Sequence, residues 1–281
     1  MGDFGRDTAV SGADGVYAAQ LNDDWEIWGP NGGYVAAIAL RAAGAESRFV
    51  RPANCAVQFL GVAAFDEVTC TVEIVKQTRR AEVIRVMMTQ GERVILQLNC
   101  WAVADDLLDK RHVHAEMAHL PPEHVPTILE HFEAAGVEPG DGPPFPFWNN
   151  FEQRPTEFII DWENRGVLAP EWATWMKFDP VPHTDDPWIE AGRVLLLADI
   201  GSWPAAHRAF DPSTEQGFIA PSLDVACHFT DLDTTEWLLA DHVSPASRDG
   251  LMGSTSSIWS ADGRLLASGV SQLIVTPTPS N

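Results

Sequence analysis

The sequence predicts an α+β protein that contains the same structural unit twice. In each half, a helix of small apolar residues precedes a series of strands, and this order occurs twice along the 281 residues. The spacing also repeats: Phe59 and Gly91 lie 32 positions apart, and the matching Phe229 and Gly263 lie 34 positions apart. An internal repeat of this kind determines the architecture of a chain. Its 45% hydrophobic and 21% charged residues are typical of a globular protein with a sizeable core.

The first unit is expected over residues 1–105. Residues 31–45 predict a helix, because glycines stand at the entry of an Ala-rich apolar run and Gly44 stands near its end. Stretches rich in Val, Ile and Thr predict the strands that follow, with a hairpin turn at 90–92. These strands are expected at 68–77, 81–89 and 93–103.

Residues 106–146 are expected to connect the two units, because this segment is acidic and rich in His and Pro. A short helix is predicted over 125–135, ended by Gly136. Five of the nine histidines lie in the connector, and their spacing matches no metal-ligand pattern. We therefore expect solvated side chains and no metal site at His112, His114, His119, His124 and His131.

The second unit is expected over residues 147–281. A helix is predicted over 192–210, bent or ended at Pro204 because proline cannot donate a helical hydrogen bond. A hairpin turn is predicted at 260–263, where the sequence reads SADG. Strands are expected at 147–161, 171–178, 222–230, 236–243, 251–260 and 264–276.

The charge of the chain excludes some classes of partner. Its 18 basic and 40 acidic side chains give a net charge of −22, which opposes binding to nucleic acid or to anionic membranes. No apolar run approaches the roughly 20 residues of a spanning helix, and the N-terminus lacks a signal pattern. The four cysteines form no C-x-x-C pair, so we expect buried free thiols. These features predict a soluble, cytoplasmic protein.

Overlaying the two halves sets three polar residues of the second unit opposite inert residues of the first. These pairs are Asp199 with Ala36, Ser222 with Pro52, and Gln272 with Cys100. A carboxylate in an otherwise apolar helix is costly to bury unless it is hydrogen-bonded or paired, so Asp199 is a candidate functional group. Gln272 shares a strand face with Val270 and Ile274, and we expect that face to be buried.

These segments resemble the TesB-like acyl-CoA thioesterases, in which two hot-dog units are fused in one chain. The resemblance extends from about residue 24 to residue 275 and lies in GPNGGYVAAIALRAA, LLLADIGSWP, PSLDVACHF, EWLLADHVS and DGRLLASGVSQLIV. It implies a double hot-dog fold, with antiparallel sheets wrapped around central helices, and an acyl-CoA substrate without a cofactor. It also implies that Asp199, Ser222 and Gln272 hold the attacking water, with Ser in place of the family's Thr.

We expect Asp199 to orient that water and accept its proton, with a pKa raised by its apolar helix. Ser222 is a weaker candidate for a covalent nucleophile. No G-x-S-x-G elbow surrounds it, and His228 lies about 20 Å away along an extended strand. Backbone N–H groups at Gly32 and Gly33, or at Gly192, are candidates for an oxyanion hole. Further candidates for substrate binding are Tyr34, Asp224 and His228, and for the phosphates of coenzyme A, Arg79, Arg80 and Arg248.

Two alternatives to hydrolysis stay open at this point. A hot-dog hydratase or acyltransferase acts on the same thioesters, and a protein that kept the fold without the chemistry binds them without turnover. In each case the first unit is expected to be a structural partner without catalytic residues. Association into a homo-oligomer is also possible, because hot-dog units pair their sheets.

Overall fold

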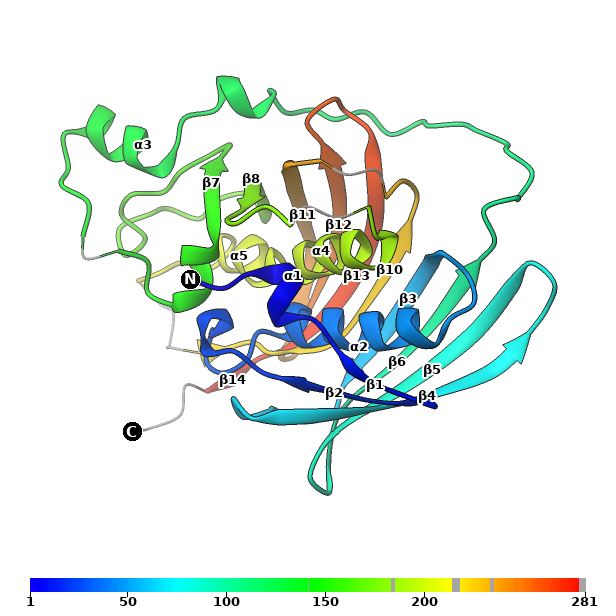
Figure 1. Cartoon of the computed structure of the whole chain (residues 1–281). Coiled ribbons are helices and arrows are strands. Elements are labelled where there is room, and N and C mark those ends of the chain that lie inside the picture. The colour runs from blue at the N-terminus through cyan, green and yellow to red at the C-terminus, as the bar shows by residue number, and fades with distance from the viewer. Residues whose placement is uncertain (141, 183–184, 214–217, 233–234, 278–281) are drawn as a thin grey trace.

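A computed structural model describes residues 1–140, 142–182, 185–213, 218–232 and 235–277 of the chain (Figure 1). Its helices are α1 (Phe4–Asp7), α2 (Gly32–Glu46), α3 (Ile128–Ala135), α4 (Pro187–Ile200) and α5 (Ser202–His207). The strands of the first half are β1 (Ser11–Ala13), β2 (Val16–Gln20), β3 (Arg51–Phe59), β4 (Glu67–Gln77), β5 (Ala81–Gln90) and β6 (Arg93–Val103). Those of the second half are β7 (Phe151–Pro155), β8 (Glu171–Phe178), β9 (Phe218–Ile219), β10 (Ser222–Phe229), β11 (Trp237–Arg248), β12 (Leu251–Ser260), β13 (Leu265–Ile274) and β14 (Thr276–Pro277).

Twelve strands form one antiparallel sheet in the order β1-β2-β4-β5-β6-β3-β10-β13-β12-β11-β8-β7. Strands β3 and β10 pair antiparallel and so join the two halves of the chain, with Ala56 opposite Ala226. The sheet curves around α2 and α4, which lie side by side in its concave face (Figure 1). The expected architecture of two helix-and-meander units is therefore present.

Small residues let α2 and α4 pack closely. A Cβ added at Gly33 would lie 2.7 Å from Cα of Leu196, and one added at Gly192 would lie 3.3 Å from Cβ of Ala37. Both helices are capped at their N-termini, where Asn31 accepts a hydrogen bond from the N–H of Tyr34 and Asp186 caps α4. The predicted first helix is confirmed, and most of its side chains are buried.

The second helix differs from its predicted bounds of 192–210. It begins five residues earlier, because Asp186 caps it and Pro187 occupies the first helical position, where a missing N–H costs nothing. It breaks at Gly201, three residues before Pro204. The cause is still Pro204, which has no N–H to donate to the carbonyl of Ile200 four residues earlier.

The region from 106 to 161 contains the largest error of the sequence-based prediction. The predicted strand over 147–161 is wrong, because a 3-10 helix occupies Pro146–Asn150 and only Phe151–Pro155 is a strand. The connector helix is present as α3, and Gly136 ends it in a left-handed conformation as expected. Strand β3 and the N-terminal elements α1, β1 and β2 were not predicted.

Three further expectations concern the cysteines, metal sites and membrane-spanning helices. All four cysteines are buried and free, as predicted. Among the described residues, no group of three His, Cys, Asp or Glu is placed to hold a metal ion. In the same part of the chain, no helix is long and apolar enough to cross a membrane.

Candidate active site

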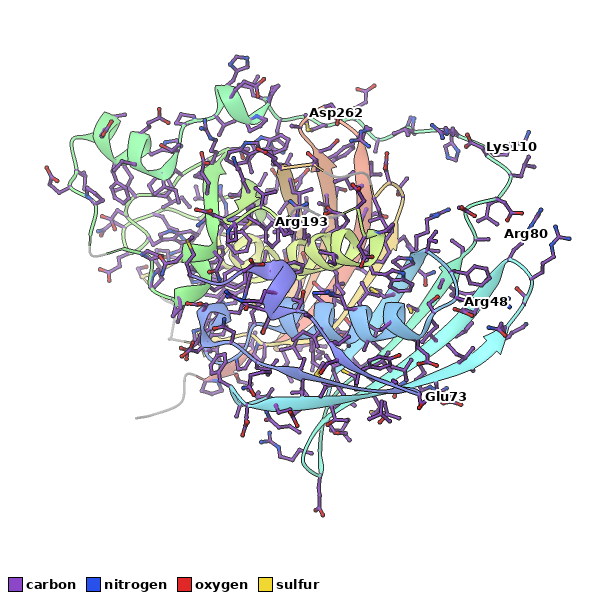
Figure 2. All side chains as sticks on the ribbon, viewed as in Figure 1. Arg48, Glu73, Arg80, Lys110, Arg193 and Asp262 are labelled. Carbon is purple, nitrogen blue, oxygen red and sulfur yellow. The ribbon has the colours of Figure 1, made fainter. Side chains whose placement is uncertain are left out.

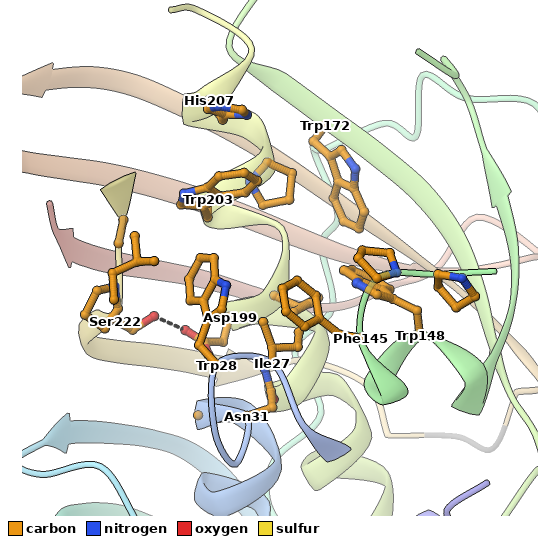
Figure 3. A pocket seen from close by; sticks show the side chains of 18 of the residues that line it. Ile27, Trp28, Asn31, Phe145, Trp148, Trp172, Asp199, Trp203, His207 and Ser222 are labelled. Carbon is orange, nitrogen blue, oxygen red and sulfur yellow. Dashed lines mark hydrogen bonds between the residues drawn. The ribbon is translucent and has the colours of Figure 1, made fainter. Parts of the chain in front are cut away.

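The carboxylate of Asp199 lies in the last turn of α4, with only 7% of the residue exposed. It accepts a hydrogen bond of 2.7 Å from Oγ of Ser222, the first residue of β10 (Figure 3). The backbone N–H of Gly33 also favours the charged form of this carboxylate and lowers its pKa. The aspartate of the second half is therefore bound by the first turn of α2, a helix of the first half.

The N-terminus of α2 suits a carboxylate for two reasons. Its backbone N–H groups have no acceptor within the helix, and the helix dipole places partial positive charge there. Glycine at both first positions lets the carboxylate approach the backbone, since a Cβ at Gly32 would lie 3.2 Å from Oδ2 of Asp199. Gly32 therefore lies beside Asp199, and the roles predicted for Gly32 and Gly33 in binding substrate and stabilising the oxyanion stay predictions.

Burial raises the pKa of Asp199 to about 6. Desolvation of the charged form is the main cause, and the nearby carboxylate of Asp224 adds a smaller increase. The hydrogen bond from Ser222 and the backbone N–H of Gly33 favour the charged form and offset part of the increase. A carboxylate with this pKa is ionised at neutral pH and still accepts a proton readily, as a general base must.

Ser222 faces Asp199 because of an irregularity in its strand. Along β10, Ser222 pairs with Leu273 and Asp224 pairs with Gln272, so Leu223 is an extra residue. A bulge of this kind re-aims the side chains that precede it. Strand β3 has the same bulge between Pro52 and Asn54. The shared bulge confirms that Pro52 is the counterpart of Ser222.

The expectation that Gln272 faces a buried site is wrong. Gln272 is exposed, as are its same-face neighbours Val270 and Ile274, which are 55% and 37% exposed. Its backbone N–H donates to Oδ1 of Asp224 at 3.0 Å on the outer face of the sheet. The residue of β13 that faces the helices is Ser271, whose Oγ lies 2.7 Å from Oγ of Ser202.

The strand registers show where the error arose. Val225 pairs with Ser271, and its counterpart Cys55 pairs with Cys100. Cys100 therefore corresponds to Ser271, and Gln272 corresponds to the outward-facing Trp101. The sequence overlay was one residue out of register at this strand, and in a strand a shift of one residue moves a side chain to the opposite face.

The helix overlay also needs correction. Aligning α2 and α4 at their capped N-termini places Gly44, and not Ala36, opposite Asp199. A Cβ at Gly44 would lie 2.5 Å from the indole of Trp188, which is 5% exposed. The first half therefore has glycine at the position equivalent to Asp199. The buried indole of Trp188 packs against that glycine, so no carboxylate lies there.

A cavity of about 1290 Å³ opens beside Asp199 and Ser222. Five of the chain's eleven tryptophans line it, and none of the five is among the residues predicted from the sequence to form the site. The number of tryptophans in the sequence was the available signal, but these five come from loops, a strand and helices that are separate in the sequence and meet only in the folded chain. These residues are Trp28, Trp148, Trp162, Trp172 and Trp203.

Of the other residues predicted to bind substrate, Tyr34 has a structural role. It is fully buried, stacks on Trp25 and donates a hydrogen bond to the carbonyl of Asp7. Asp224 and His228 lie on the outer face of β10, away from the helices. Gly192 packs on Ala37 within the helix pair. The predictions that Tyr34, Asp224 and His228 bind substrate, and that Gly192 contributes to the oxyanion hole, are not supported.

The three arginines predicted to bind phosphate do not line the cavity. Figure 2 shows Arg80 in the β4–β5 turn, on the side of the molecule opposite α5, and its Nε lies 3.8 Å from Asp106. Arg79 is exposed in the same turn. Arg248 is exposed at the β11–β12 turn and lies 3.3 Å from Asp249. A role for them in binding coenzyme A stays a prediction.

Family models match both halves of the chain. The acyl-CoA thioesterase N-terminal domain matches residues 21–103, and the acyl-CoA thioesterase C-terminal domain matches residues 122–275. The chain belongs to the acyl-CoA thioesterase family. The expected family, and with it the class of thioester hydrolase, is thereby confirmed.

Solved structures confirm the double hot-dog fold. A hot-dog protein of unknown function from Alicyclobacillus acidocaldarius is 21% identical, with a TM-score of 0.75, over 99% of this chain and 98% of that one. The acyl-CoA thioesterase II TesB2 of Mycobacterium marinum is 17% identical, with a TM-score of 0.76, over 98% of this chain and 99% of that one. A comparison with curated protein sequences finds no match.

Proposed function

We propose that this thioesterase hydrolyses acyl-CoA by direct attack of a water molecule that Asp199 activates. The observation that carries the proposal is the buried carboxylate of Asp199 at the wall of an apolar cavity, held by Ser222 and by the N-terminus of α2. Its pKa of about 6 makes it an effective base at neutral pH.

The reaction follows from this geometry. Water attacks the carbonyl carbon of the thioester while its proton passes to Asp199, and the carbonyl oxygen becomes an oxyanion. The oxyanion then re-forms the carbonyl, the carbon–sulfur bond breaks, and the proton passes from Asp199 to the departing thiolate. The products are the free acid and the thiol of coenzyme A, and Asp199 is again ionised.

We assign stabilisation of the oxyanion to the first turn of α2. Gly32 lines the cavity, and a side chain there would crowd the ring of Phe59 and the carboxylate of Asp199. The absence of a side chain lets a substrate carbonyl approach the positive end of the helix. Ser222 has a positioning role, because its hydroxyl donates to Asp199 and fixes the carboxylate.

This assignment is tested by thiol release from acyl-CoA. Asp199→Asn should lower kcat by about 10³-fold or more, because an amide cannot accept the proton. Ser222→Ala should lower kcat by only about 10-fold to 100-fold, because it leaves the base in place; complete loss would instead indicate a serine nucleophile. Saturable acyl-CoA binding by the wild type with no thiol release would favour the non-catalytic alternative.

A further inference from the structure

The part of the cavity next to the Asp199–Ser222 pair has walls made of aromatic rings (Figure 3). The indole of Trp28 meets the indole of Trp203 edge-on, with ring centroids 5.9 Å apart and planes at 82°. It meets the ring of Phe145 in the same way, at 6.1 Å and 85°. Each ring comes from a different segment of the chain, so tertiary structure brings them together at this place.

The backbone of Trp28 is in an unfavourable conformation. Its φ is 58°, in the left-handed region that bulky residues rarely adopt. It stands in a tight turn, in which the N–H of Ile27 donates to the carbonyl of Gly29 at 2.8 Å. The side chain is also 44% exposed, so burial explains little of its presence. A strained, half-exposed tryptophan over a catalytic pair indicates a role in binding.

Trp203 is also the first ring of a stack that continues along the cavity wall. Trp203 stacks on His207, with centroids 4.2 Å apart and planes at 22°, and His207 stacks on Trp162 at 5.6 Å and 19°. All three rings line the cavity. The stacked rings present a face and an edge to the cavity. A planar aromatic ring of a ligand can contact either one without a change in these side chains.

From these rings we infer that the enzyme prefers acyl groups that carry an aromatic ring close to the thioester. The inference rests on the proposed function, because it names the substrate class of that site. The amide groups of pantetheine need hydrogen-bond partners or water and therefore take the mouth of the cavity, which leaves the ring-lined part to the acyl group. An aromatic ring gains edge-to-face contacts with Trp28 and Trp203, and it loses less conformational freedom than an alkyl chain.

The test compares acyl groups with equal numbers of carbon atoms. Phenylacetyl-CoA and octanoyl-CoA each carry eight acyl carbons, and 3-phenylpropanoyl-CoA and nonanoyl-CoA each carry nine. We expect kcat/KM for the aryl member of each pair to exceed that for the alkyl member by about tenfold or more. Equal values, or faster hydrolysis of the alkyl member, would overturn the inference.

Trp28→Leu should remove this preference by lowering kcat/KM for the aryl substrates about tenfold, with little change for the alkyl ones. Trp101→Leu is the matched control, because Trp101 is 39% exposed on the outer face of β6 and lies outside the cavity. It should keep the wild-type preference. An equal loss on aryl and alkyl substrates in Trp28→Leu would show that Trp28 only supports the fold.

Trp28→Asn keeps the test decisive should the leucine variant fold poorly, because asparagine tolerates the left-handed conformation. It should unfold at a temperature at or above that of the wild type and still lose the aryl preference. Retention of that preference by the folded asparagine variant would overturn the inference. Failure of the proposed function itself is distinguishable, since it would appear as no Asp199-dependent thiol release from any substrate in the panel.

Discussion

Asp199 is in an environment that opposes its charged form, and two predictions follow at the scale of this residue. The first concerns activity. Because the base must be ionised, kcat/KM should fall about tenfold per pH unit below a pKa near 6. A pH–rate profile of the wild type measures this directly. A profile that stays flat down to pH 4.5 would show that no group with the pKa of Asp199 is required.

The second prediction concerns stability. The pKa of Asp199 is higher in the folded state, about 6, than its ordinary value of 3.8, so the folded state binds the proton more tightly. Its contribution therefore favours folding at low pH, declines as the pH rises from about 4 to about 6, and stays unfavourable above that. A difference of about two pKa units corresponds to roughly 3 kcal/mol.

Asp199→Asn removes that cost while keeping a side-chain oxygen that accepts the hydrogen bond from Ser222. It should raise the free energy of unfolding at pH 8 by about 1–3 kcal/mol and leave it nearly unchanged at pH 4. Urea unfolding at the two pH values makes the comparison. Equal effects at pH 4 and pH 8 would show that ionisation of Asp199 is not the cause.

Gln272 supplies a prediction that separates sequence resemblance from structure. Its side chain is exposed on the outer face of β13, so Gln272→Ala should keep kcat within about twofold of the wild type. The same thiol-release assay measures this. A loss of 100-fold or more would indicate that Gln272 reaches the catalytic water and that the register described here is wrong.

At the scale of the elements, the contact between α2 and α4 positions the catalytic carboxylate. A Cβ at Gly33 would lie 2.7 Å from Cα of Leu196, so Gly33→Ala must push the two helices apart. It should lower the free energy of unfolding by about 1–3 kcal/mol and, by moving the N–H that binds Asp199, lower kcat as well. Gly44→Ala is the control, because it collides with Trp188 far from the site. It should lose stability but keep kcat, and equal kcat values for the two variants would contradict this role of the helix contact.

The elements also show what sequence alone can predict. The helix at 31–45 and the strands of both meanders were predictable, because hydrophobic periodicity and turn residues determine them locally. Asp199 was identifiable, because a lone carboxylate in an apolar helix is conspicuous. The face on which Gln272 lies was not, because it depends on a one-residue register that only strand pairing determines. The ring walls were not predictable either, since Trp28, Phe145 and Trp203 meet only in the folded chain.

At the scale of the whole molecule, the two halves form one structure. They share a continuous sheet through the β3–β10 pair and a single core cluster that includes buried residues of both central helices. We therefore expect one cooperative unfolding transition in calorimetry, with equal calorimetric and van't Hoff enthalpies. Two resolved transitions would show that the halves fold independently.

The asymmetry between the halves gives the molecule its single proposed site. One end of the helix pair holds Asp199 against the N-terminus of α2, and the other end holds Trp188 against Gly44. The first half is thus not inert in this account, because its helix binds the carboxylate that the second half supplies. Neither half contains the proposed site by itself.

The central claim is that water, and not the carboxylate of Asp199, attacks the thioester. A single turnover in water enriched in ¹⁸O, with enzyme in excess over acyl-CoA, tests it most directly. The account predicts that the acid released in this first turnover carries one ¹⁸O atom and that Asp199 carries none. Unlabelled acid together with ¹⁸O in the carboxylate of Asp199 would contradict it, because that pattern requires Asp199 itself to have attacked the thioester.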